Sequence, residues 1–412
     1  MNSENHLPLS GETEQDSSRS QVRSLRELID RVSGREFRSA QTDGESGIAD
    51  LTPFPFLALV GQMEMKLALA LALINPVIGG VLLIGPRGTG KTTAVRSLID
   101  LLPQIPRSLC YYGCMPEDVE GGGIDAICPD CARKYGEGEP LATLDKVRLV
   151  ELPLNARLED VIGGLDERAA IHERLRLKRG LLSQADENLL YVDEVNLLAD
   201  EIVDAILDAA AQGSYTVRRG PISSTYRSRF VLIGSMNPEE GRLRPQILDR
   251  FGLRVVARGL SDRDERLEAY KRVQAYLSNP RSTVKQYSAE TNQMAQEIQS
   301  ARDLLPQVDL PNEVAQMGLE LIEQLKIDSL RAEITLFEAG RAHAAADGRE
   351  RVTYEDLRHV APMALRLRSS AFMVEYLNQQ NVEDEKIYAI LDNKLRAQST
   401  PGEFVDDSAK SL

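Results

Sequence analysis

The feature that most constrains this chain is the pattern G-x-x-x-x-G-K-T at residues 85–92. The glycines let backbone N–H groups approach an anion without a clash from Cβ atoms, and the lysine and threonine add an ammonium and a hydroxyl. An apolar run at 81–84 precedes the pattern and a helical pattern at 92–102 follows it. This order predicts a phosphate-binding loop rather than a ligand-free turn, made of Gly85, Pro86, Arg87, Gly88, Thr89, Gly90, Lys91 and Thr92.

Short apolar runs recur along the chain and alternate with helical patterns. Continuous β-branched and aliphatic runs are typical of strands buried on both faces of a parallel sheet. We therefore expect an α/β fold, a parallel sheet with helices on both faces. A hairpin is predicted at 215–226. The strands are predicted at 81–84, 147–152, 189–192, 230–234 and 253–257, and the helices at 62–74, 92–102 and 201–211 with Gly213 as a stop.

The chain divides into four parts by composition. Residues 1–50 are polar and predict a disordered tail with one short helix near 25–32. The α/β core is expected at 51–260, with a cysteine-containing insertion at about 105–140. An all-helical domain is expected at 261–370, followed by a C-terminal helix and tail at 371–412. The helical periodicity of that domain is found at 262–277, 289–304, 313–325, 329–346 and 354–367.

Composition argues against several classes of function. The net charge of −14 and the absence of Trp argue against nucleic-acid binding as the main activity. The longest apolar run, 67–74, is far shorter than the ~18 residues that a membrane-spanning helix needs. The N-terminus has no secretory signal pattern, so we expect a cytoplasmic protein.

Polar residues follow two of the predicted strands. Asp193 and Glu194 end the run at 189–192, where Asp193 would hold the metal and Glu194 would act as general base toward water. Asn237 follows the run at 230–234 and would bond the γ-phosphate or the water. A solvated strand end and an Asn-Pro turn are the ordinary alternatives, but the order of these segments after the phosphate-binding loop favours a catalytic site.

Two arginines are further candidates for contact with the nucleotide. Arg250, in a segment that ends R-F-G, would stabilise charge on the γ-phosphate of a neighbouring subunit. Arg331, near the start of a C-terminal helix, would reach the nucleotide from that helical domain. The alternatives are a surface arginine paired with Asp249 and an exposed helix charge.

All four cysteines lie in the predicted insertion, with the spacing C-x3-C-x13-C-x2-C. Two closely spaced thiol pairs separated by a glycine-rich loop match a structural Zn²⁺ site. Reduced thiols and a redox disulfide stay open as alternatives. The candidate ligands are Cys110, Cys114, Cys128 and Cys131.

These features together resemble the small AAA+ subunit of magnesium chelatase, the ATPase that drives Mg²⁺ insertion into protoporphyrin IX in chlorophyll and bacteriochlorophyll biosynthesis. The resemblance covers about 53–367, and its most specific stretches are VRLVELPLN at 147–155, GLLS at 180–183, LYVDEVNLL at 190–198, RFVLIGSMNPEEG at 229–241 and LRPQILDRFGL at 243–253.

The resemblance implies an AAA+ P-loop NTPase core with a helical lid domain, ATP and Mg²⁺ as cofactors, and a homo-hexameric ring. It places Lys91, Thr92, Asp193, Glu194 and Asn237 in the cis site, with Asn237 as sensor 1, Arg250 as the arginine finger and Arg331 as sensor 2. It also implies two partners, a larger subunit with AAA+ and integrin-like domains and a porphyrin-binding catalytic subunit.

Two other functions stay open at this point. One is an AAA+ remodelling ATPase of the MoxR or cobalt-chelatase type that acts with an integrin-domain partner. The other is a nucleic-acid motor, for which the predicted hairpin with Arg218, Arg219 and Arg227 is the only supporting feature.

Overall fold

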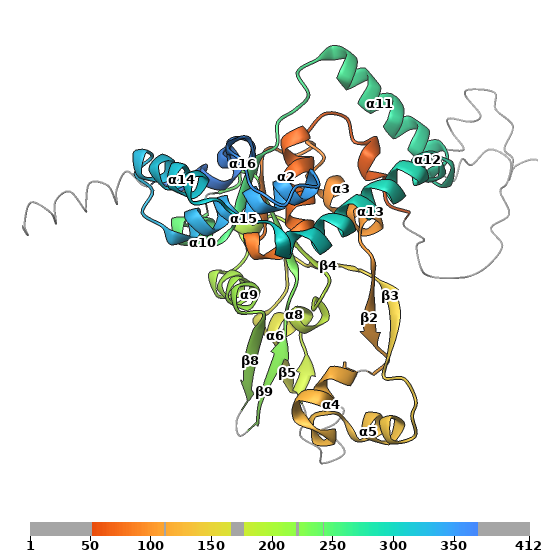
Figure 1. Cartoon of the computed structure of the whole chain (residues 1–412). Helices are drawn as coiled ribbons and strands as arrows, with labels where there is room; N and C mark the ends of the chain where they lie inside the picture. Colours follow the sequence, from red (N-terminus) through yellow and green to blue (C-terminus); the bar gives the residue numbers. More distant parts are fainter. Residues whose placement is uncertain (1–51, 111–112, 166–176, 220–221, 242, 370–412) are drawn as a thin grey trace, which may run out of the picture. The chain divides into compact units, whose positions relative to one another are not determined.

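We describe the protein from a computed structural model (Figure 1). It describes residues 52–369 apart from 111–112, 166–176, 220–221 and 242. The predicted N-terminal tail with its short helix, and the predicted C-terminal helix and tail, lie outside the described residues. The described residues belong to one compact unit that begins at Thr52.

A five-stranded sheet in which all neighbouring strands are parallel lies at the centre of this unit. Its strands are β1 (Val81–Ile84), β4 (Leu149–Leu152), β7 (Leu189–Val192), β10 (Val231–Met236) and β11 (Leu253–Val256). They are arranged in the order β11-β1-β10-β7-β4. All five predicted strands are therefore confirmed, and β1, β7 and β10 are buried along their whole length.

Helices cover both faces of the sheet, as the alternation of apolar runs and helical patterns predicts. In β1, Val81 and Leu83 join one apolar cluster, whereas Leu82 and Ile84 join the other, because successive side chains point to opposite faces. The first cluster includes residues of α2 (Met63–Ile74), α3 (Lys91–Arg96) and the 3-10 helix η3 (Ser97–Leu101). The second includes residues of α6 (Leu158–Ile162), α8 (Leu181–Gln184), α9 (Asp200–Gln212) and α10 (Pro245–Arg250).

The C-terminal half of the described chain is helical. Five helices match the predicted segments. The helix α12 was not predicted because it has only seven residues, although the Asn279 cap and the proline after it are signals for the start of a helix. The helices are α11 (Arg263–Ser278), α12 (Pro280–Gln286), α13 (Ser288–Leu304), α14 (Asn312–Gln324), α15 (Leu330–Ala346) and α16 (Tyr354–Leu365).

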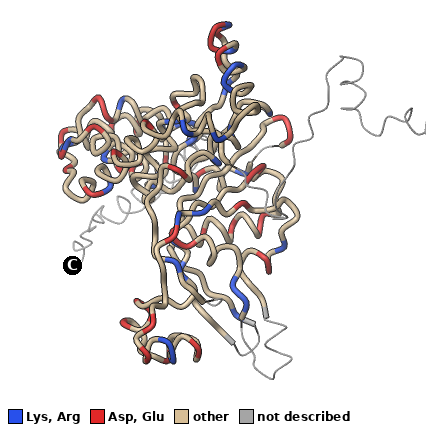
Figure 2. The backbone as a smooth tube through the Cα atoms, turned by 90° about the vertical axis from the view of Figure 1, so that its right-hand side faces the viewer, with Lys and Arg blue, Asp and Glu red and all other residues tan. Residues whose placement is uncertain are grey.

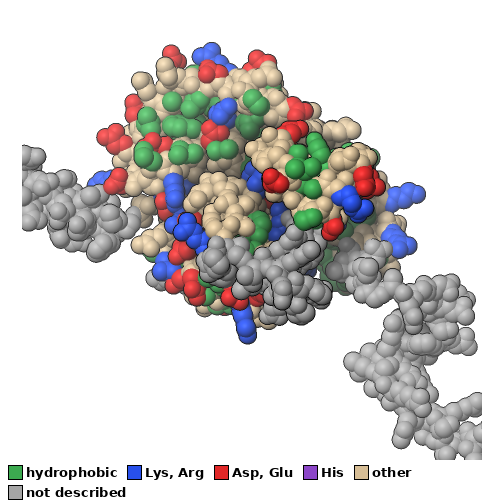
Figure 3. Space-filling model, turned by 90° about the horizontal axis from the view of Figure 1, so that it is seen from below, with side chains coloured by type: hydrophobic (Ala, Val, Ile, Leu, Met, Phe, Trp, Pro, Cys, Tyr) green, Lys and Arg blue, Asp and Glu red, His purple; other side chains and the backbone are tan. Residues whose placement is uncertain are grey.

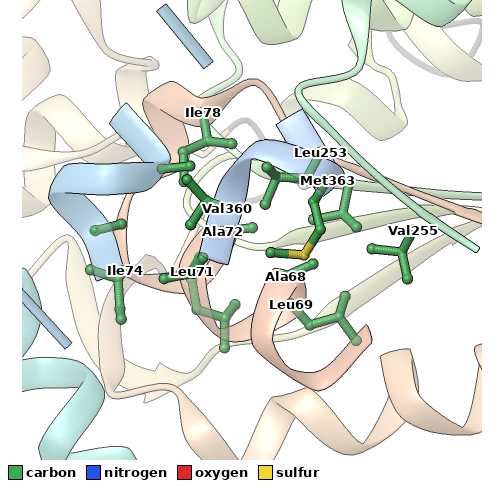
Figure 4. Packing of buried hydrophobic residues seen from close by; sticks show 14 of the residues in the cluster. Ala68, Leu69, Leu71, Ala72, Ile74, Ile78, Leu253, Val255, Val360 and Met363 are labelled. Carbon is green, nitrogen blue, oxygen red and sulfur yellow. The ribbon is translucent and has the colours of Figure 1, made fainter. Parts of the chain in front are cut away.

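These C-terminal helices share the first apolar cluster with α2 and the sheet. Figure 4 shows Val360 and Met363 of α16 beside Ala72 of α2 and Leu253 of β11. Shared burial of this kind holds the helices against the sheet through the hydrophobic effect. The division of the chain near residue 260 stays a prediction.

Three antiparallel pairs of short strands extend from the core (Figure 1). The predicted hairpin is confirmed as β8 (Ser214–Arg219) and β9 (Ile222–Arg227). The pairs β2 (Gln104–Ser108) with β3 (Ala142–Lys146), and β5 (Gly163–Leu165) with β6 (Leu177–Arg179), were not predicted. Both lack the apolar runs of the central strands, since no residue of β2 or β3 is buried and β5 and β6 have three residues each.

The pair β2–β3 leads to α4 (Pro116–Gly122), η4 (Ile124–Ala126) and α5 (Pro129–Gly136) in the predicted insertion. Seen from that end, apolar and charged side chains lie among one another on the surface (Figure 3). Acidic and basic residues are likewise interleaved along the described backbone (Figure 2). Short 3-10 helices complete the described elements, η1 (Phe56–Ala58), η2 (Pro76–Ile78), η5 (Val195–Leu197) and η6 (Leu305–Gln307). Within the described ranges, no helix is both long and apolar enough to cross a membrane.

Candidate active site

The phosphate-binding pattern at 85–92 forms the loop between β1 and α3, and its last two residues, Lys91 and Thr92, begin that helix. Gly88 and Gly90 have φ angles of 81° and 82°, a backbone conformation that glycine adopts without strain, and a Cβ built on either would meet no atom within 4 Å. Gly85 differs, because a Cβ there would lie 2.2 Å from the carbonyl oxygen of Ala257. The loop therefore has open space on its concave side and tight packing against β11.

Lys91 lies at the base of this loop and is largely buried. Its Nζ donates to the carbonyl oxygens of Gly85 and Pro86 at 2.6 and 2.8 Å. Burial lowers the pKa of Lys91 below its ordinary value, and the nearby Asp193 carboxylate opposes that shift. An ammonium held by neutral carbonyl groups can exchange them for phosphate oxygens, so the residues fit a nucleotide phosphate.

Asp193 accepts hydrogen bonds from two hydroxyl groups that were not predicted from the sequence. Tyr191 Oη donates to Asp193 Oδ1 at 2.9 Å, and the Ser235 hydroxyl donates to the same oxygen. Tyr191 Oη also lies 3.1 Å from Thr92 Oγ1, so one phenol connects both predicted metal-binding groups. Burial raises the pKa of Tyr191 well above its ordinary value, which keeps the phenol protonated as a donor.

A sequence signal for these hydroxyls exists in retrospect. Tyr191 and Ser235 are the polar side chains in the otherwise apolar and glycine-containing runs LLYV and VLIGSM. Both are buried, with 1% of the residue surface exposed in each case. Because buried polar groups need hydrogen-bond partners, a hydroxyl inside such a strand indicates a polar neighbour at the sheet edge.

Glu194 adopts a left-handed backbone conformation, with a φ angle of 50°. Such a conformation costs a non-glycine residue on the order of 1–3 kcal/mol and is found most often at functional sites. The Glu194 carboxylate lies 3.2 Å from the guanidinium of Arg87, which also pairs with Glu240 at 2.5 Å. The phosphate-binding loop and the predicted general base are therefore in direct contact.

Asn237 follows β10, the strand that separates β1 from β7 in the sheet. It is 95% buried, and its Oδ1 accepts a hydrogen bond from the backbone of Glu239 at 3.2 Å. One cleft is lined by the loop residues Arg87 to Thr93 together with Asp193, Glu194, Ser235, Met236 and Asn237. The structure thus brings together the residues that were predicted for the cis site.

The two predicted arginines lie elsewhere and share a different cleft. Arg250 and Arg331 line this second cleft, and neither is among the described residues that line the cleft at the phosphate-binding loop. Arg250 Nη1 pairs with Asp208 of α9 at 2.6 Å, not with Asp249. Asp249 instead pairs with Arg368 at 2.7 Å and accepts from Ser329 at the start of α15. Arg331 is therefore grouped with Arg250 rather than with Lys91.

The four cysteines converge although they are separated by up to 20 residues in sequence. Their sulfur atoms all lie within 4.8 Å of one another. Cys110 Sγ is 3.8 Å from Cys114 Sγ and 3.5 Å from Cys128 Sγ. The backbone N–H of Cys128 donates to Cys114 Sγ at 3.3 Å. No cysteine lines the cleft at the phosphate-binding loop.

The sheet order and the cleft define the class of protein. In chain order the strands are placed 5-1-4-3-2, with the phosphate-binding loop after the first strand, the acidic pair after the third and an asparagine after the fourth. Carboxyl ends of parallel strands meet at one edge of a sheet, which is where ligands of such folds bind. The chain is a P-loop ATPase of the AAA+ type.

Comparison with known proteins identifies the family. Residues 165–250 match the family described as magnesium chelatase, subunit ChlI, and residues 319–387 match the AAA lid domain. A magnesium-chelatase subunit ChlI homolog of Methanocaldococcus jannaschii is 42% identical over 80% of this chain and 90% of its own length. The magnesium-chelatase 38 kDa subunit of Acidiphilium rubrum is 41% identical over 76% of this chain and 90% of that relative. The chain belongs to the magnesium-chelatase subunit ChlI family.

A solved structure is also similar in sequence. It is a chain from the complex between subunits BchI and BchD of magnesium chelatase, based on a cryo-EM reconstruction. The two chains are 39% identical over 79% of this chain and 99% of the other, with a TM-score of 0.45.

Proposed function

We propose that this chain is the ATPase subunit of a magnesium chelatase. It hydrolyses Mg-ATP, and partner subunits use that hydrolysis to insert Mg²⁺ into protoporphyrin IX for chlorophyll or bacteriochlorophyll synthesis. The observation on which this rests is the cleft that joins the phosphate-binding loop to Asp193, Glu194 and Asn237, in a chain about 40% identical to magnesium-chelatase subunits over most of its length.

Each residue of the cleft has a separate role in the proposed hydrolysis of ATP. Lys91 and the loop backbone bind the phosphates, and Thr92 and Asp193 hold the Mg²⁺ that accompanies ATP. Glu194 accepts the proton of the attacking water, and Asn237 orients that water or the γ-phosphate. Bound Mg²⁺ supplies charge neutralisation at the phosphates. Arg87 pairs with one carboxylate oxygen of Glu194 in this structure, which leaves the other oxygen to accept from water.

We infer that Arg250 and Arg331 both act on the nucleotide of a neighbouring copy in a ring, which we take to be a hexamer. Neither arginine lines the cleft of its own chain, and the two lie together in a second cleft. A guanidinium that approaches the γ-phosphate from the next subunit supplies positive charge where negative charge develops. An isolated subunit would therefore hydrolyse ATP slowly.

Partner proteins complete the proposed activity. A larger subunit with AAA+ and integrin-like domains would receive the conformational change, and a porphyrin-binding subunit would perform metal insertion. The described part of the chain offers no site that we assign to a porphyrin.

Reconstitution with both partner subunits tests the function. We expect Mg²⁺ insertion that requires this chain and ATP, and loss of insertion with Lys91→Ala and with Glu194→Gln. A chain that does not bind the larger subunit, or that supports insertion only of Co²⁺ into a corrin precursor, would instead favour the remodelling or cobalt-chelatase alternative.

Mixing two inactive variants tests the contribution in trans. Arg250→Ala removes the arginine, and Lys91→Ala removes phosphate binding from a different chain. In a random equimolar ring, about a quarter of the interfaces would combine an intact loop with an intact arginine, so activity returns to about a quarter of the wild type. Absence of any recovery, in rings shown to be mixed, would contradict a role in trans.

We also infer that Cys110, Cys114, Cys128 and Cys131 bind one structural Zn²⁺. An ion about 2.3 Å from each of four thiolates places the sulfurs about 3.8 Å apart at the corners of a tetrahedron. The distances of 3.8 Å from Cys110 Sγ to Cys114 Sγ and of 3.5 Å to Cys128 Sγ lie close to that edge length. Metal analysis of the purified chain tests the site, with about one zinc per chain expected. A chain that is purified without zinc and has four reactive thiols or a disulfide would refute the site.

A further inference from the structure

The segment at 109–141, which we call the cysteine module, has little apolar interior among its described residues. Its buried cluster consists of Ile127, Leu141 and two of the thiols, Cys114 and Cys131. A segment of about 30 residues cannot bury enough surface to be stable by itself, and natural domains of that size use a metal or disulfides. The centre of the module is therefore the group of sulfur atoms.

The first thiol pair is built into a turn that continues from β2. The Ser108 hydroxyl donates to the carbonyl oxygen of Cys114 at 2.7 Å and accepts from the backbone N–H of Cys110 at 3.1 Å. Anything that fixes the two sulfurs of this turn also fixes the residues on either side of Cys114. Two of those neighbours, Gly113 and Asp118, contact other parts of the protein.

One contact joins the module to the hairpin β8–β9. Asp118 of α4, four residues after Cys114, pairs with Arg227 of β9 at 2.8 Å. About a third of each side chain is exposed, so the pair is partly shielded from solvent. The separation of 109 residues in sequence means that this ion pair exists only because the module and the hairpin are held side by side.

A second contact joins the module to the pair β5–β6. The guanidinium of Arg179, the last residue of β6, lies directly against the backbone of Gly113, where a Cβ would be 1.5 Å from Nη1. Gly113 has a φ angle of 68° and immediately precedes Cys114. The same guanidinium lies over the ring of Tyr226 of β9, 5.6 Å from its centre. Both strand pairs therefore meet the module within a few residues of one cysteine.

We propose that the zinc ion docks the cysteine module onto the two strand pairs, so that zinc occupancy controls how rigidly β6 and β9 are held. This inference rests on the zinc site proposed above. The ion holds the turn around Cys114, the turn positions Gly113 and Asp118, and these two residues hold Arg179 and Arg227. Without the ion, the described residues of the module bury only Ile127 and Leu141 besides two of the thiols, which is too little apolar surface to keep those contacts in register.

Zinc content and hydrogen exchange of the full-length chain test this role together. Because the chain has only four cysteines, thiol titration reports on the module alone. We compare the wild type, Cys131→Ser and Asp118→Asn, with Asp125→Asn as the matched control, since Asp125 is an exposed carboxylate of the same module with no ion pair to the described hairpins.

We expect one zinc and no reactive thiol in the wild type. Cys131→Ser should contain no zinc, and the amide hydrogens of α4, β6 and β9 should exchange about tenfold faster than in the wild type. Asp118→Asn should keep zinc and speed exchange in β9, and Asp125→Asn should change neither. Zinc removal by a chelator from the wild type repeats the first comparison if Cys131→Ser does not fold.

The outcomes separate the two claims. A wild type below about 0.2 zinc per chain refutes both the metal site and its docking role. A zinc-loaded wild type whose β6 and β9 exchange equally fast after zinc removal keeps the site and refutes the docking role. If the amides of β9 exchange at the same rate in Asp118→Asn as in Asp125→Asn, the ion pair between Asp118 and Arg227 does not hold β9, and that part of the docking proposal is wrong.

Discussion

Replacing Tyr191 by phenylalanine tests whether the Tyr191 hydroxyl orients Asp193 and Thr92, the two residues that we propose as Mg²⁺ ligands. The change deletes one oxygen, which donates to Asp193 at 2.9 Å and lies 3.1 Å from the hydroxyl of Thr92. The ring keeps its place in the apolar cluster, where 1% of the residue is exposed. Asp193 keeps the Ser235 hydroxyl as its remaining side-chain donor. The variant therefore alters the orientation of the proposed Mg²⁺ ligands without removing either.

The expected size follows from the hydrogen bonds that are lost. A hydrogen bond to a charged group contributes about 1.5–3 kcal/mol. Partners that orient metal ligands typically change metal affinity or activity about 10- to 100-fold when they are removed. We therefore expect the Mg²⁺ concentration for half-maximal ATP hydrolysis to rise about 10- to 100-fold. Because only one hydroxyl leaves, the free energy of unfolding should change by about 1 kcal/mol or less.

Steady-state ATP hydrolysis, measured against free Mg²⁺ at saturating ATP, checks this expectation. Tyr215→Phe is the matched control, because it deletes the same atom from β8, outside the cleft at the phosphate-binding loop. The phenol of Tyr191 stays protonated at neutral pH, so the effect should not depend on pH between 6 and 9 by more than about twofold. If Tyr191→Phe shows the same Mg²⁺ dependence and the same kcat as Tyr215→Phe, the proposed connection between Tyr191 and the metal ligands is wrong.

Three further outcomes follow from the site and the fold. Glu194→Gln should still bind ATP, measured by fluorescent-nucleotide titration, while hydrolysis falls about 10²- to 10⁴-fold; a normal rate would exclude Glu194 as the base. Gly85→Ala should lower the free energy of unfolding by about 1–3 kcal/mol, because its Cβ would lie 2.2 Å from the Ala257 carbonyl oxygen, and an unchanged denaturation midpoint would contradict that packing. Asp356 is buried, which alone raises its pKa, but hydrogen bonds from Arg349 and Thr353 hold the folded-state pKa well below the ordinary value. Its stabilisation is therefore complete above the unfolded pKa of about 4 and is lost as pH falls below it, so Asp356→Asn should flatten the acid side of the stability curve, measured by urea denaturation from pH 6 to 3.

The sequence alone determined the central strands and the convergence of the residues that were predicted for the cis site. Strands that are buried on both faces are continuous apolar runs. Such runs can be recognised in the sequence without knowing which elements pack against the strands. Asp193, Glu194 and Asn237 lie just beyond the carboxyl ends of two such runs. Lys91 and Thr92 begin the helix that follows the loop after a third run. Since these ends meet at one sheet edge, convergence of the residues could be predicted before any contact was known.

The tertiary structure alone decided which groups support those residues. The strand order inserts β10 between β1 and β7 and so places Ser235 beside Asp193, although 42 residues separate them. The local sequence around Asp193 does not show that Ser235 is its neighbour, because the order of the strands depends on how the helices pack on both faces of the sheet. The grouping of Arg331 with Arg250 depends in the same way on where α15 packs.

The cysteine module shows the same division. The spacing of Cys110, Cys114, Cys128 and Cys131 indicated two thiol pairs but left zinc, free thiols and a disulfide open, because spacing along a chain does not set distances between pairs. Folding of the intervening helices brought all four sulfurs within 4.8 Å. It also placed Asp118 against Arg227 and Gly113 against Arg179, contacts between segments that share no local pattern and meet only when the chain is packed.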